Sequence, residues 1–66
     1  MQIRYFEDTD TLLITISNRP PVETQSINDN LYIDLDEDGR VVSITIEHAS
    51  HSTNISELLF QRVSAG

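Results

Sequence analysis

The pair Asp38-Gly39, set between two runs of alternating apolar residues, constrains the fold more than any other feature of the sequence. Asp and Gly tolerate the positive φ angles that a two-residue type I′ turn requires at both central positions. The pattern predicts a β-hairpin over residues 30–47, and a four-residue loop at the same place would keep its register. A slip of one residue would turn one strand's apolar side chains toward water. The expected apolar pairs are Leu31 with Ile46, Ile33 with Ile44 and Leu35 with Val42.

A second hairpin is predicted at the N-terminus, where residues 1–6 and 11–16 flank the acidic loop 7–10. The segment LLITI favours a strand, because β-branched side chains pack well on a pleated surface. Pro20 and Pro21 lack backbone donors and should end the pairing, which leaves residues 22–27 as a short strand or an extended loop. The expected apolar pairs are Tyr5 with Leu12, Ile3 with Ile14 and Met1 with Ile16.

The C-terminal stretch has the spacing of an amphipathic helix. Asn54 is a good N-cap residue, and Glu57 follows it three positions later. Apolar residues then recur at helical spacing, at Ile55, Leu58, Leu59 and Val63. With the two hairpins, this predicts a single α+β domain over residues 1–66. Its expected architecture is an antiparallel sheet of four or five strands with one C-terminal helix packed on one face.

The charge balance is strongly acidic, with 11 Asp and Glu against 4 Lys and Arg and a formal net charge of −7 in 66 residues. Nucleic acids and anionic membranes both attract clustered basic residues, so neither is an expected partner. Acidity favours steering toward a basic protein, or it only keeps a small domain soluble. Because the chain has neither an apolar run of about 20 residues nor the apolar segment of a secretory signal, we expect a soluble cytoplasmic protein.

Two groups of residues raise the question of metal binding. The run 34–38, followed by Gly39, matches the opening of a calcium loop, D-x-D-x-D-G, but Thr45 stands where such a loop has Glu. His48 and His51 form H-x-x-H, and two imidazoles fall short of the three or four ligands of a zinc site. We therefore predict no metal and no cofactor. A metal-binding domain built on the run 34–38 is the weakest alternative.

No catalytic signature occurs in the sequence. It has no Cys, no G-x-S-x-G sequence and no glycine-rich phosphate loop. Ser, His and Asp are all present, but in a chain of 66 residues their joint presence carries little weight. We therefore predict that the protein is not an enzyme, and no catalytic residue is assigned.

The predicted registers leave four apolar side chains on the face opposite the predicted helix. A contiguous apolar patch usually marks an interface, and a core this small benefits from a partner. Contiguity depends on the order of the two hairpins in the sheet, which the sequence leaves open. We predict that this face is buried in a homodimer or against a protein partner. The four candidate interface residues are Phe6, Leu13, Tyr32 and Val41, beside Arg4, Asp34, Ser43 and Thr45.

Several motifs resemble those of one bacterial family. They are I-x-Y-x-x-x-x-D at residues 3–10, LLITIS at 12–17, V-E-T at 22–24 and Y-I-D-L-D-E-D-G-R-V-V-x-I-x-I-E-x-A-S at 32–50. The pattern resembles the small domains of unknown function family 2283 (DUF2283). Family members more usually carry Gly in place of Ser43 and an acidic or apolar residue in place of His48. The family has no established activity, so the resemblance assigns no catalytic or binding residue.

Three functions follow from these observations. In size and acidity the family resembles components of toxin–antitoxin gene pairs, which suggests by analogy an antitoxin-like domain that binds another protein. A homo-oligomeric structural module without a separate partner is the alternative. The metal-binding domain is the third.

Overall fold

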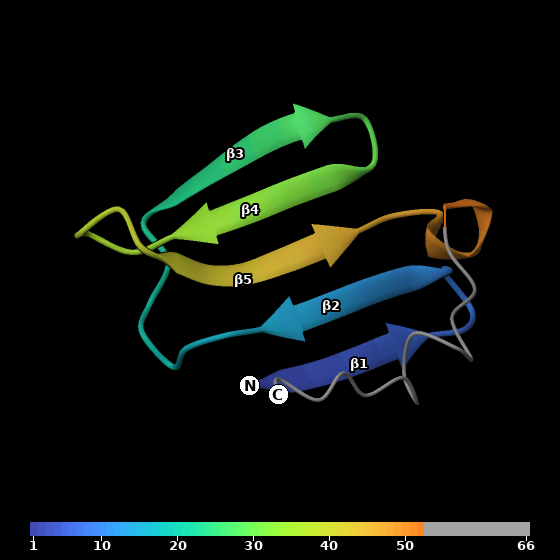
Figure 1. The fold of residues 1–66 in the computed structure, drawn as a ribbon, viewed down its shortest axis with the longest axis horizontal. Helices are drawn as coiled ribbons and strands as arrows, with labels where there is room; N and C mark the ends of the chain where they lie inside the picture. The colour runs from blue at the N-terminus through green and yellow to red at the C-terminus, as the bar shows by residue number, and fades with distance from the viewer. Residues whose placement is uncertain (53–66) are drawn as a thin grey trace, which may run out of the picture.

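In a computed structural model of the chain, which describes residues 1–52, five strands form one antiparallel sheet (Figure 1). The strand order β1-β2-β5-β4-β3 places β5 at the centre, where it joins the N-terminal hairpin to the β3–β4 hairpin. A short 3-10 turn, η1 (Ala49–His51), follows β5. The strands are β1 (Gln2–Phe6), β2 (Thr11–Thr15), β3 (Glu23–Asn28), β4 (Leu31–Leu35) and β5 (Val41–Ile46).

The prediction of an α+β fold with a C-terminal helix packed on the sheet is wrong. Residues 1–52 are mostly β, and the one helical element among them is the three-residue turn η1. The helix predicted over residues 54–63 lies outside the described residues. Helical spacing is weak ground for a fold class, because a helix of about ten residues is marginal in water without tertiary packing. No helix within residues 1–52 is long and apolar enough to cross a membrane.

The N-terminal hairpin has the predicted register, and its loop ends at Asp10, whose φ of 53° lies in the left-handed region. The ladder stops at Gln2, so the expected pair of Met1 with Ile16 lies beyond it. Alternation of apolar residues was therefore sufficient to align these two strands. The confirmed apolar pairs are Tyr5 with Leu12 and Ile3 with Ile14.

The central hairpin keeps the predicted pairing only away from its turn. Nearer the turn, Leu35 pairs with Val41 instead of Val42, which leaves Val42 as an extra residue in β5. This bulge contradicts the predicted pair of Leu35 with Val42. The confirmed pairs are Leu31 with Ile46 and Ile33 with Ile44.

The turn of this hairpin is also longer than predicted. The N–H of Gly39 donates to the carbonyl of Asp36 at 3.0 Å, and the N–H of Asp36 donates to the carbonyl of Arg40 at 2.9 Å. Gly39 alone in the turn has a positive φ, 77°, so the predicted type I′ turn, which needs two, is wrong. The physical cause is the Asp36 carboxylate, which accepts the N–H of Asp38 at 2.9 Å and that of Arg40 at 3.0 Å. These bonds stabilise a five-residue loop over a two-residue turn.

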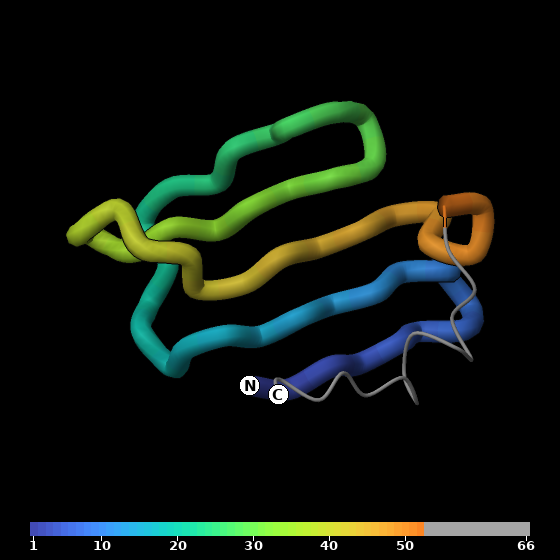
Figure 2. Tube along the Cα trace, viewed as in Figure 1, coloured from blue at the N-terminus to red at the C-terminus, as the bar shows by residue number. Residues whose placement is uncertain are grey.

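The segment between β2 and β3 crosses to the opposite edge of the sheet. Figure 2 shows it running from the end of β2 past the ends of β5 and β4 to β3. The N–H groups of Ile16 and Ser17 donate to the carbonyl of Val42 at 2.8 and 3.2 Å, so the extra residue of β5 ties down the start of the crossing. The segment predicted as a strand or a loop is strand β3, and all of its residues are exposed at the sheet edge.

Few apolar side chains are buried. Within residues 1–52 they are Leu12, Val42 and Ala49. All five strands lie in the same sheet, so no second strand layer within these residues packs on either face. The sheet therefore has two faces, and the side chains on them differ.

Candidate functional site

One face of the sheet is apolar over four of its five strands, and on β3 the same side carries Glu23 and Gln25. Paired residues on antiparallel strands point to the same side, so the register places two rows of side chains across β1, β2, β5 and β4. We call these two rows the apolar face. Leu12 is fully buried in it, whereas Ile3, on the edge strand, is 43% exposed. The rows are Ile3, Ile14, Ile44 and Ile33, and Tyr5, Leu12, Ile46 and Leu31.

The opposite face, here called the mixed face, carries three of the four candidate interface residues, Phe6, Leu13 and Tyr32. Leu13 and Tyr32 both pair with Thr45, from either side, so a threonine separates them. Phe6 lies on the edge strand opposite Thr11, and it is 42% exposed. Val41, the first residue of β5, pairs with Leu35, which shares a side with Ile33, so the bulge moves Val41 to the side of the apolar face. The four residues therefore do not form one continuous patch.

A polar row on the mixed face is satisfied within the sheet. The hydroxyls of Thr24 and Ser43, on the two strands beside β4, donate to the two carboxylate oxygens of Asp34 at 2.5 and 2.7 Å. These two bonds, that from Thr24 first, hold the pKa of Asp34 below its usual value. Ser43 is buried. The row stabilises the pairing of three strands, and both carboxylate oxygens of Asp34 accept a hydrogen bond within it.

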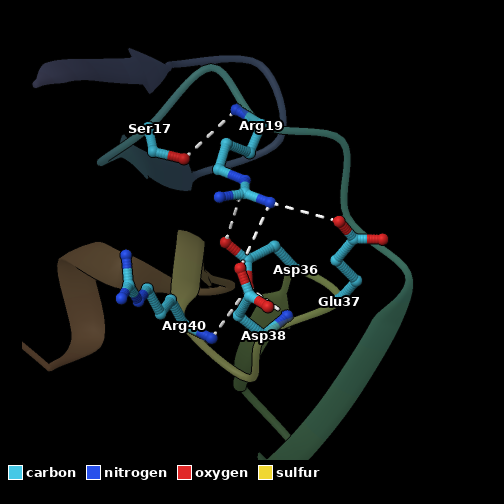
Figure 3. A network of polar contacts seen from close by, with 6 residues as sticks. All are labelled: Ser17, Arg19, Asp36, Glu37, Asp38 and Arg40. Atoms are coloured by element: carbon cyan, nitrogen blue, oxygen red, sulfur yellow. Dashed lines mark hydrogen bonds and ion pairs between the residues drawn. The ribbon is translucent and has the colours of Figure 1, made fainter.

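The acidic turn is organised around one arginine from the crossing segment (Figure 3). The Nε of Arg19 lies 3.4 Å from Oδ2 of Asp36, and its guanidinium also lies 3.4 Å from Glu37 and 3.3 Å from Asp38. The Asp36 side chain is only 3% exposed. Backbone N–H bonds, that of Arg40 first, and the charge of Arg19 lower the pKa of Asp36. Asp36 therefore closes the loop, and Arg19 holds the crossing segment against it.

The run 34–38 does not converge on a calcium position. Asp34 is bonded to hydroxyls of the mixed face, whereas Asp36 is bonded to the turn and to Arg19. His48 and His51 lie edge to face with ring centroids 5.9 Å apart. Within residues 1–52, no group of three or more His, Cys, Asp and Glu side chains is placed to hold a metal ion.

Asp10 joins the N-terminal loop to η1. Its carboxylate accepts hydrogen bonds from the hydroxyl of Tyr5 at 2.5 Å and from the hydroxyl of Ser50 at 2.7 Å. Its backbone carbonyl accepts the N–H of Ala49 at 3.0 Å. The bond from Tyr5, followed by that from Ser50, lowers the pKa of Asp10, and the same bond raises the pKa of Tyr5. The cluster anchors the chain as it leaves β5.

Sequence reasoning missed the roles of Asp10, Arg19 and Asp36. For Asp36 a signal exists, because Asp is favoured at the first position of a turn that ends in Gly. The bonds of Asp10 to Ser50 span 40 residues and depend on where η1 lies, so no local pattern indicates them. Arg19 reaches the turn only because the crossing segment passes it.

Comparison with known proteins gives one family. A family model described as "Protein of unknown function (DUF2283)" matches residues 2–50, which include all five strands and Ser50. This confirms the resemblance found in the sequence. No curated protein and no solved structure matches the chain.

Proposed function

The chain belongs to the DUF2283 family, a family of unknown function, and we propose that it is a protein-interaction domain that docks through its apolar face. The observation that carries this proposal is the pair of uncharged rows running across four strands. Apart from the hydroxyl of Tyr5, which is bonded to Asp10, the rows contain no polar side-chain group. Such a surface gains free energy chiefly by removing apolar area from water.

The architecture supports the proposal. Stable domains consist of at least two packed layers, because a sheet must bury one apolar face against another element. Within residues 1–52 all strands belong to one layer. Leu31, Ile33 and Ile44 are only half-buried, and Ile3 is more exposed still. A docked protein would supply a second layer to the sheet of residues 1–52.

The distribution of charge supports a binding role in which the partner lies on the apolar face. The acidic side chains cluster in the loops at the two ends of the strands, residues 7–10 and 36–38. On the side of the apolar face the strands carry one acidic residue, Glu23, which is exposed on the edge strand β3. The acidic loops can orient a partner at the rim without being desolvated beneath it. A binding role also needs no catalytic residue, and the proposal assigns none.

Two narrower forms of the proposal differ in the partner. In the first, the domain is antitoxin-like and covers a surface of another protein, as its size and acidity suggest by analogy. In the second, it is a homo-oligomeric module. A metal-binding function has less support, because the carboxylates of Asp34 and Asp36 are already bonded to other groups.

The test compares two substitutions on one edge strand. Ile3 and Phe6 both lie in β1 and are 43% and 42% exposed, but they belong to opposite faces. Ile3→Asp places a charge on the apolar face, and Phe6→Asp places the same charge on the mixed face. The wild type and both variants, each confirmed as folded by circular dichroism, are used as baits for affinity purification from the native host with quantitative mass spectrometry.

The proposal expects a protein at near-stoichiometric yield, either another protein or a second copy, that Ile3→Asp loses and Phe6→Asp retains. Loss with Phe6→Asp alone would instead assign the interface to the mixed face, as the sequence predicted. If all three baits associate with nothing, the chain is not an interaction domain.

A further inference from the structure

We infer that the apolar face binds a second copy of the same chain, so that two sheets stack face to face into a two-layer β-sandwich. The inference rests on the proposed function and names the partner on the apolar face as a second copy of the chain. It draws on three features of the described residues: the charge pattern of the face, the geometry of the sheet and its area.

The charge pattern permits self-association in spite of the net charge of −7. When two copies stack, each side chain of the apolar face meets side chains of the same face, and neither row contains a charged residue. Asp34 and Arg4 lie on the mixed face, which would point to solvent in the dimer. On the same side, Glu23 lies on the exposed edge strand β3, opposite Leu35, and would stand at the rim of the stack. No like charges would therefore be buried at its centre, which is the usual barrier to stacking an acidic protein on itself.

The geometry of a single sheet suits its own copy. Sheets with the same twist pack with their strands at about 30° to each other and about 10 Å apart, with interdigitating side chains. Two copies of one sheet necessarily share their twist. The middle of the interface would be formed by β-branched residues of the row that begins at Ile3, namely Ile14, Ile44 and Ile33. A two-fold axis closes such an assembly at two copies, because each face is used once.

The area of the apolar face suits only a weak dimer. Its four strands, about 4.8 Å apart and each about five residues of about 3.3 Å long, give a flat footprint of about 300 Å². The two copies together would bury about 600 Å² before the relief of the side chains is added, below the roughly 1,200 Å² at the lower end of stable interfaces. We therefore expect a dimer that dissociates on dilution.

The first experiment measures the mass of the full chain by light scattering over a range of concentrations. The expected mass rises on concentration to twice the 7.5 kDa of one chain. Ile3→Asp should raise the dissociation constant by at least about tenfold, because it buries an unpaired charge in the interface. Phe6→Asp, matched in strand and exposure, should leave it within about threefold. Should Ile3→Asp fail to fold, Ile3→Thr, which keeps the β-branched shape, should raise the constant by a smaller factor.

The dependence of binding on salt concentration distinguishes a second copy of the chain from a basic protein partner. The acidic loops at the rims of two copies repel, and about 0.5 M salt screens charges more than about 4 Å apart. Raising NaCl should therefore tighten the homodimer, whereas it would weaken a complex with a basic protein.

Two results would overturn the inference. One is a mass of a single chain at every concentration, and the other is a dimer that Phe6→Asp dissociates and Ile3→Asp does not. If the chain is a monomer by light scattering, but in affinity purification it binds another protein that Ile3→Asp no longer binds, the homodimer is wrong and the proposed function stands. A chain that binds neither would overturn both.

Discussion

The side chains on the two faces of the sheet are stabilised in different ways. On the mixed face, Thr24 and Ser43 donate to Asp34 across three strands, so the polar groups find partners inside the sheet. On the apolar face, the rows that contain Ile14 and Ile44 cannot be satisfied by hydrogen bonds within the sheet, because apolar side chains lower the free energy only by leaving water. Within residues 1–52 these polar groups of the mixed face are bonded inside the sheet, whereas no second strand layer covers the apolar face. This difference is the ground on which we propose the apolar face as the interaction surface.

The largest expected effect comes from a charge at the centre of the apolar face. Ile44→Asp should destabilise the domain by about 3 kcal/mol or more and unfold most of it, because the new carboxylate is half-buried without a partner. The neighbouring variant Thr45→Asn, on the same strand and the mixed face, should cost about 1 kcal/mol or less. Urea unfolding followed by circular dichroism measures both. Equal losses from the two variants would remove the distinction between the faces.

A loss of stability of intermediate size is expected from substitutions in the acidic turn, which lies next to the bulge at the start of β5. The pattern of acidic residues alone suggests that Asp36→Asn and Asp38→Asn are equally harmless. The structure separates them, because Asp36 is 3% exposed and accepts two backbone N–H groups, whereas the Asp38 side chain is 53% exposed. In thermal melts Asp36→Ala should lower Tm clearly more than Asp38→Ala. Asp36→Asn should fall between them, because it keeps an acceptor oxygen but loses the ion pair with Arg19. The reverse order would mean that Asp36 does not close the turn.

The smallest expected effect is a pH dependence that belongs to the mixed face. The pKa of Asp34 is lower in the folded chain than its ordinary value of 3.8, so its stabilising contribution is complete above that value. It is lost as the pH falls through the lowered folded pKa. Unfolding measured between about pH 5 and pH 2 should show stability falling toward acid, less steeply in Asp34→Asn than in the wild type. Ser43→Ala, which removes one of the two donors, should give an intermediate slope. An unchanged slope in Asp34→Asn would show that the mixed face is not held by this carboxylate.

The sequence predicted the parts of this fold that depend on neighbouring strands. Alternation aligned Ile3 with Ile14 and Ile33 with Ile44, since each pair belongs to one hairpin. It also indicated a turn near Gly39, but not the five-residue loop. The loop depends on hydrogen bonds to the Asp36 side chain, which no pattern of apolar residues reveals.

The parts that could not be predicted depend on contacts between distant segments. The pairing of Leu12 with Ile46 joins the two hairpins, and it decides which apolar side chains are neighbours. Without it, the sequence left open whether Leu13 and Tyr32 are neighbours, and the structure places Thr45 between them. The apolar face escaped notice as a site because a helix was expected to cover it. Its role depends on what packs there, and local propensity does not determine that.

Intermolecular contacts between isotope-labelled and unlabelled chains test the central claim most directly. In a mixed sample at concentrations where the mass is that of a dimer, filtered nuclear Overhauser spectra detect only contacts between copies. The account predicts contacts from the methyl groups of Ile14, Ile33 and Ile44, which lie in one row of the apolar face. Contacts confined to the rings of Phe6 and Tyr32 would place the interface on the mixed face and contradict the account, as would no contacts at all.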